Sequence, residues 1–165
     1  MKKYCLLLTC LFMTWSMAYA QVAEPKFAGE AALLNEDGTL TMLQNETGSL
    51  NMSFTVTADG MSSTTRIPSN DIIQLIVKSS NVNESPASTI VVFKMKPKKN
   101  KRTASLGAYG IKSKDIVKFK GDTYGESSYI ITLENLSPGE YGLWYGDKIE
   151  KNTLGEHQMS FFGID

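Results

Sequence analysis

Residues 135–145 read Asn-Leu-Ser-Pro-Gly-Glu-Tyr-Gly-Leu-Trp-Tyr, a turn that runs directly into an alternating segment. Pro138 fixes φ and the glycine after it accepts positive φ, which favours a tight turn. From Tyr141 onward every second residue is apolar, as in a strand with one inward face. A buried tyrosine needs a partner for its hydroxyl, and the backbone of the preceding turn is within reach of Tyr141. We therefore expect a turn followed by a strand at 140–146.

The rest of the chain has the same character. Short runs rich in Val, Ile, Phe, Tyr and Thr are separated by Gly, Asn, Asp, Ser and Pro, with no sustained period of 3.6. The clearest alternation is at 49–57, and Asn35-Glu36-Asp37-Gly38 is typical of a hairpin turn. The pattern predicts an all-β domain, a single antiparallel β-sandwich of about nine or ten strands. The other expected strands are 27–34, 39–43, 71–78, 89–96, 102–108, 115–120, 128–134 and 157–164.

The segment from Leu136 to Tyr141 resembles the turn of transthyretin-like and carboxypeptidase-regulatory-like sandwiches. It is also similar to the tyrosine corner of immunoglobulin-like and fibronectin type III sandwiches. Fibronectin domains usually have one more residue between the glycine and the tyrosine, and Leu143 stands where antibody domains have a cysteine. With residues 161–165, this part of the chain resembles exported bacterial proteins of uncharacterised function. The resemblance implies an immunoglobulin-like or transthyretin-like sandwich and transfers no catalytic residue.

Residues 1–20 have the build of a secretory signal peptide. Lys2 and Lys3 precede an apolar run, and Ala18-Tyr19-Ala20 supplies the small residues of a cleavage site. The run is too short for a membrane anchor, which needs about 20 residues, and Thr9 before Cys10 disfavours a lipoprotein. We expect cleavage after Ala20, one β-sandwich domain at 21–165, and a bacterial protein that is exported, periplasmic or secreted.

Composition narrows the chemistry of the mature chain. Cys5 and Cys10 are the only cysteines and leave with the leader, which excludes thiol catalysis and cysteine-based metal sites. Without Lys2 and Lys3 the chain keeps 15 basic and 17 acidic residues, a balance that does not suggest nucleic acid or a membrane surface as a general partner. We expect no cofactor, no bound metal and no membrane span in the mature chain.

Aromatic residues are the main candidates for ligand binding. Trp144 points away from the face of Tyr141, so on an open sheet it would form an exposed platform for a glycan or a protein. Tyr124, in a glycine-flanked loop, is the second candidate. The alternative is that other parts of the fold cover both side chains.

A basic stretch at 94–102 contains the proline and asparagine of a hairpin tip. Within it, an anionic partner such as lipid phosphate, acidic polysaccharide or nucleic acid could dock on Lys96, Lys98, Lys99, Lys101 and Arg102. The alternative is a solvated turn whose lysines keep a sheet edge from pairing with other chains.

No catalytic residue is expected. His157 is the only histidine, and no nucleophile motif accompanies it. The first hypothesis is a non-catalytic binding or structural module of the cell envelope that contacts a glycan or protein. The rivals are a secreted hydrolase with paired carboxylates, and an inhibitor or assembly subunit that pairs through an edge strand.

Overall fold

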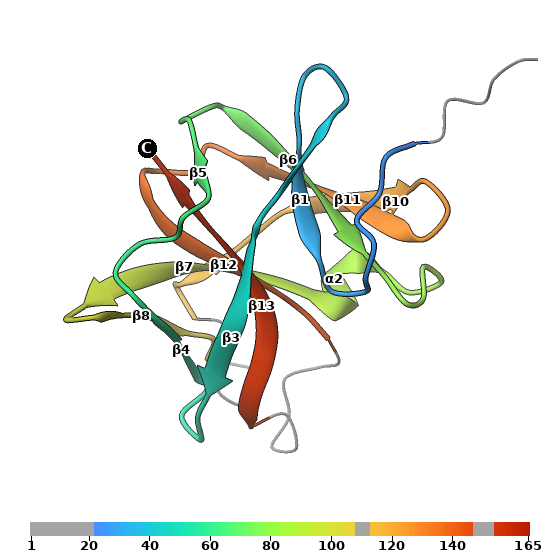
Figure 1. The fold of residues 1–165 in the computed structure, drawn as a ribbon. Coiled ribbons are helices and arrows are strands. Elements are labelled where there is room, and N and C mark those ends of the chain that lie inside the picture. Colours follow the sequence, from blue (N-terminus) through green and yellow to red (C-terminus); the bar gives the residue numbers. More distant parts are fainter. Residues whose placement is uncertain (1–21, 108–112, 147–153) are drawn as a thin grey trace, which may run out of the picture.

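The computed structural model of this chain describes residues 22–107, 113–146 and 154–165 and is all-β (Figure 1). These residues form thirteen strands and one four-residue helix, α2 (Pro86–Thr89). Five strands make an antiparallel sheet with two free edges, called the open sheet below. Their order is β10 (Lys120–Tyr124), β11 (Ser128–Glu134), β6 (Ile72–Lys78), β1 (Ala31–Leu34) and β2 (Leu40–Met42).

The second sheet closes on itself, because β12 (Gly139–Tyr145) pairs with both β13 (Gly155–Ile164) and β7 (Ile90–Lys98). The ring continues from β13 through β3 (Gln44–Leu50), β4 (Thr55–Asp59) and β8 (Lys101–Ser105) to β7. Two short strands attach to it, β5 (Arg66–Ile67) on β13 and β9 (Ile116–Val117) on β7. The expected two-sheet sandwich is therefore wrong: six strands form a β-barrel, at the lower left of Figure 1.

The part of the barrel wall that contains β12 is buried on both sides, which explains the error. Along β12, Tyr141 and Leu143 pack toward the open sheet, whereas Trp144 belongs to the cluster inside the barrel. One core thus lies between the open sheet and the barrel wall, and the other fills the barrel. Alternation of side chains occurs in a sandwich and in a barrel alike, so it could not reveal that β12 finds a partner at each edge.

The tyrosine turn forms as the sequence predicts. Tyr141 is 2% exposed, and its hydroxyl donates a hydrogen bond to the carbonyl oxygen of Ser137 at 2.6 Å. Gly139 has φ of 144°, a conformation that L side chains rarely adopt. The turn therefore fixes where β12 enters the barrel wall.

The strand expected at 49–57 is wrong, because β3 and β4 meet there in a hairpin. The side chain of Asn51 accepts hydrogen bonds from the backbone N–H groups of Ser53 and Thr55, at 3.0 and 3.1 Å. Phe54 has φ of 53°, and its N–H donates to the carbonyl oxygen of Asn51. Asparagine in this role favours a turn, and the apolar alternation on its two sides concealed it.

Of the other expected strands and turns, some are confirmed and one is wrong. The strand at 128–134 is confirmed, and the one at 71–78 matches β6 apart from its first residue. The hairpin turn at 35–38 is confirmed, with Gly38 at φ of 81°. The segment at 115–120 instead contributes to two strands, β9 and β10. No helix of the described residues is long and apolar enough to cross a membrane.

Candidate ligand-binding hollow on the open sheet

Trp144 does not form an exposed platform. It is 4% exposed inside the barrel, and its ring lies 5.1 Å from that of His157 at an angle of 43°. Its edge reaches a hollow of about 420 Å³ that Phe27 and Tyr145 also line. The alternative expectation, that other parts of the fold cover this side chain, is therefore correct for Trp144.

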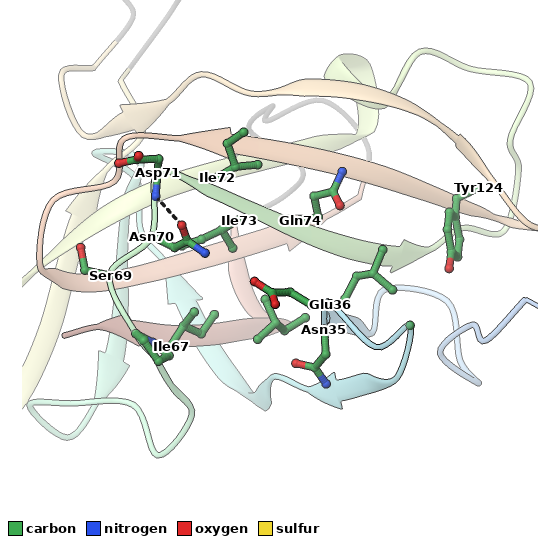
Figure 2. Close-up of a pocket in the computed structure, with 14 residues that line it drawn as sticks. Asn35, Glu36, Ile67, Ser69, Asn70, Asp71, Ile72, Ile73, Gln74 and Tyr124 are labelled. Atoms are coloured by element: carbon green, nitrogen blue, oxygen red, sulfur yellow. Dashed lines mark hydrogen bonds between the residues drawn. The ribbon is translucent and has the colours of Figure 1, made fainter.

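Tyr124 is half-buried at the end of β10 and lines a hollow of about 890 Å³, called the Tyr124 hollow below. Its other walls come from the end of β1 with the turn after it, the loop after β5, and the start of β6. Figure 2 shows Tyr124 at one end, Ser69 and Asn70 at the other, and Gln74 and Glu36 between them. The lining residues are Leu33, Leu34, Asn35, Glu36, Gly38, Ile67, Pro68, Ser69, Asn70, Asp71, Ile72, Ile73, Gln74 and Tyr124.

Strand register places the ring and one amide of this hollow on the same face. Tyr124 pairs with Ser128, which pairs with Lys78 on β6. Residues paired across antiparallel strands point to the same side, and so do alternate residues of one strand. Gln74 and Ile72 therefore share the outer face of the open sheet with Tyr124. Ile72 is 56% exposed there, an apolar side chain open to solvent beside polar ones.

The turn wall is fixed by its own hydrogen bonds. The Asn35 side chain donates to the hydroxyls of Thr39 and Thr41, at 2.9 and 3.1 Å. Asp37 accepts from the hydroxyl and N–H of Thr39, and these hydrogen bonds lower the pKa of its carboxyl. Because these contacts lie within the turn, this side of the hollow does not depend on a ligand to take shape.

The opposite wall, residues 67–71, is anchored at both ends. Asp165 donates its N–H to the carbonyl oxygen of Ile67, and Asn135 donates to that of Asp71. Between them the Asp71 N–H donates to the Asn70 side-chain oxygen at 2.8 Å, the dashed line in Figure 2. The hollow is therefore preformed between two anchored walls, as most small-ligand sites are.

A buried ionic cluster around Arg102 and Glu140 extends into the barrel, apart from this hollow. The Glu140 carboxylate accepts from Arg66 at 2.5 Å, from Arg102 at 3.5 Å and from the Ser63 N–H at 2.7 Å. The hydrogen bonds that Arg66 donates to Asp165 and Glu140 raise the pKa of its guanidinium. Glu140 is thus occupied as an acceptor by two cations and is 6% exposed, an arrangement suited to holding the fold together and not to proton transfer.

The five basic candidates of the 94–102 stretch separate into two groups. Arg102 is 1% exposed inside the barrel, where it pairs with Glu46 and lies over the Phe161 ring, and is not available to a partner. Lys96 binds Asp115 at 2.6 Å. Lys98, Lys99 and Lys101 remain exposed at the tip of the hairpin that joins β7 and β8.

Sequence reasoning found Tyr124 but missed the rest of its hollow. The outward position of Gln74 and Ile72 was implicit in the strand at 71–78, whose inward residues are Ile73, Leu75 and Val77. The loop wall carried no such signal, since its position depends on β5 pairing with β13, far away in sequence. Among the described residues, no group of three or more His, Cys, Asp or Glu could hold a metal ion.

Comparison with known proteins leaves this geometry as the basis for a functional argument. No family model matches the sequence, no curated protein matches it, and no solved structure matches the fold.

Proposed function

We propose that this protein is an exported, non-catalytic binding module that holds a neutral glycan in the Tyr124 hollow. The observation that carries the proposal is the lining: an aromatic ring, an exposed apolar side chain and planar amides in one preformed hollow of about 890 Å³. That volume lies within the range of about 300–1,000 Å³ typical of small-ligand sites.

The chemistry of a sugar matches such a lining. A pyranose ring has an apolar C–H face, which can lie on the Tyr124 ring or against Ile72. Its rim carries hydroxyls, each both donor and acceptor, and the side chains of Asn70 and Gln74 offer both functions in fixed planes. The carboxylates of Glu36 and Asp71 add acceptors for hydroxyl groups.

Export agrees with this ligand class. The leader predicted at residues 1–20 would deliver the chain to the envelope or the exterior, where polysaccharides are accessible. The described part of the chain holds no cluster of groups suited to a metal, and none is required for binding through stacking and hydrogen bonds.

The test is a screen of neutral oligosaccharides followed by titration calorimetry on the best ligand. Tyr124→Ala should weaken binding about tenfold or more, the usual effect of removing a central aromatic anchor. Phe27→Ala is the matched control, because Phe27 is an aromatic side chain 59% exposed outside this hollow. Equal losses in the two variants, or no oligosaccharide bound by the wild type, would overturn the proposal.

A hydrolase remains the rival, because Glu36 and Asp71 both line the hollow. Incubation with the bound oligosaccharide separates the two functions. Release of new reducing ends that Glu36→Gln abolishes would make the hollow an active site, whereas an intact ligand supports a binding module.

A further inference from the structure

We propose that the tip of the β7–β8 hairpin is a second binding site, for an acidic polysaccharide. The tip consists of Lys98, Lys99, Asn100 and Lys101, all exposed, and its lysines line a hollow of about 610 Å³. This site lies on the barrel and shares no residue with the Tyr124 hollow. The two proposals can therefore be tested independently.

The charges of the tip are not neutralised within the described residues. Lys98 and Lys101 are Cα partners across the hairpin, so two like charges stand directly opposite each other, an unfavourable pair. The carboxylate of Asp59 lies 3.7 Å from Lys101, but the two side chains are 90% and 60% exposed, where such a pair contributes little. A positive potential therefore remains at the tip.

Lys96, two residues before Lys98 on β7, differs from the tip lysines because its charge has a close partner. Lys96 donates to Asp115 at 2.6 Å. Burial alone would raise the pKa of Asp115, but the hydrogen bonds from Lys96 and from the Ser105 N–H lower it. Within its described residues, the protein supplies a well-placed counter-charge for Lys96 and none of that quality for the three lysines at the tip.

The backbone at the tip carries a further local cost. Lys99 has φ of 56°, in the left-handed region where a non-glycine residue is disfavoured. Unfavourable local choices that persist in a folded protein cluster at functional sites. A role for the Lys99 charge in binding an anionic ligand would explain why a lysine, and not a glycine, stands at this position.

The surroundings of the tip favour a polysaccharide over a membrane. Thr57 and Thr103 line the same hollow as the lysines and Asn100, which places hydroxyl and amide groups beside the charges. An acidic sugar chain presents both carboxylate or sulfate groups and hydroxyls. A membrane-docking tip would carry apolar side chains to insert, and residues 98–101 have none. Met61, 54% exposed in the adjoining loop, makes vesicle binding the necessary counter-test.

The experiment uses two polyanions as probes, dextran sulfate and polygalacturonate, with uncharged dextran as the blank. The full exported chain should bind both polyanions, and the affinity should fall steeply as salt is raised, because exposed charges are screened within about 10 Å at about 0.1 M salt. The variant Lys98→Gln/Lys99→Gln/Lys101→Gln should lose about tenfold or more in affinity, a typical total for a few exposed charge contacts.

A matched control removes the same charge elsewhere. Lys26→Gln/Lys118→Gln/Lys120→Gln takes three exposed lysines from outside the hairpin and should change polyanion affinity less than about threefold, as expected for screened charges outside the site. Equal losses in the two triple variants would show binding by net charge and overturn the proposal.

Two further arms complete the test. Tighter binding to vesicles containing an anionic phospholipid than to either polyanion would also overturn it, and would assign the tip to a membrane surface. Tyr124→Ala should leave polyanion binding unchanged, and the hairpin variant should leave neutral-oligosaccharide binding unchanged. Failure of this site can thus be told apart from failure of the Tyr124 hollow.

Discussion

The barrel and the open sheet differ in where they place their charged side chains. The barrel takes Arg102 into its interior, 1% exposed, with Glu140 beside it. On the open sheet, the pair of Lys120 and Glu134 lies at the surface, where the two side chains are 78% and 45% exposed. The difference follows from closure, because a closed wall has an inside to fill, whereas the outer face of the open sheet leaves side chains such as Ile72 exposed.

This division has a consequence for function. Burying a charge pair costs desolvation free energy and tolerates little rearrangement, so the barrel interior suits a scaffold. The outer face of the open sheet keeps Ile72 exposed and carries the Tyr124 hollow, and it can therefore present a ligand site without disturbing a core. The barrel's own candidate site, the lysine tip, lies where β7 and β8 extend to solvent.

The largest loss of unfolding free energy is expected for Arg102→Leu, in the barrel interior. This substitution leaves Glu140 and Glu46 without one of their cations, and loss of one partner from a buried pair costs about 3–5 kcal/mol of unfolding free energy. Lys120→Leu, on the open sheet, should cost less than about 1 kcal/mol. Urea denaturation measures both.

A third variant protects this comparison from a failure to fold. Arg102→Lys keeps the positive charge but loses the planar fork, so its stability should lie between wild type and Arg102→Leu. If Arg102→Leu and Lys120→Leu destabilise equally, the buried cluster does not set the barrel apart.

The open sheet also has a largely buried ion pair, between Glu24 and Lys78, whose contribution to stability should depend on pH. The carboxyl of Glu24, 11% exposed, accepts hydrogen bonds from Lys78 at 2.6 Å, the Ser128 hydroxyl at 2.9 Å and the Glu126 N–H. Burial works against ionisation, but these contacts lower its pKa from 4.5 to about 2. They tie the segment before β1 to the ends of β6 and β11.

A lowered pKa stabilises the fold at pH values where the carboxyl is ionised in both states. The contribution is complete above about pH 5, falls as the pH drops through 4.5, and is gone near pH 2. Its ceiling is about 3 kcal/mol. Glu24→Gln should be less stable than wild type at pH 7, and the difference should shrink toward pH 2 in urea titrations. A difference independent of pH would assign the effect to packing.

Two buried tyrosines allow a closer comparison. The Tyr129 hydroxyl, on the open sheet, lies 2.8 Å from the carbonyl oxygens of both Asn81 and Glu84, and its single proton is donated between them. The Tyr141 hydroxyl, on the barrel, donates to Ser137. A typical hydrogen bond contributes about 1 kcal/mol net, so Tyr129→Phe and Tyr141→Phe should each cost about 1–2 kcal/mol in thermal or urea unfolding. A loss in only one of them would show that the two hydroxyls are not equivalent anchors.

The two regions also differ in how far the sequence could predict them. The tyrosine turn and the strands at 71–78 and 128–134 follow from local chemistry, and the structure confirms the core of each. Closure of the barrel depends on the second edge of β12 finding β7, a pairing between residues about 50 apart that no local pattern records.

Site residues follow the same rule. Tyr124 could be singled out because an aromatic side chain was expected in an accessible glycine-flanked loop, although the loop was wrong and Tyr124 ends strand β10. The wall formed by Asn70 and Asp71 could not, because the loop after β5 reaches the hollow only through its pairing with β13. Trp144 was placed on the correct face of its strand, but whether that face was open depended on the closure that the sequence does not show.

The two hairpin tips give the smallest and most local test. The open-sheet turn has Gly38 at φ of 81°, whereas the barrel turn has Lys99 at φ of 56°. Lys99→Gly relieves a backbone cost of about 1–2 kcal/mol and adds an entropic cost of about 0.5–1 kcal/mol, so the net change should be a stabilisation of at most about 1.5 kcal/mol. Gly38→Ala should destabilise by a similar amount, because alanine must pay the cost that glycine avoids. Lys99→Gln separates backbone from charge: it should leave stability unchanged while lowering polyanion affinity as much as Lys99→Gly does. If Lys99→Gly binds dextran sulfate as tightly as wild type, the lysine is not kept at this strained position for its charge.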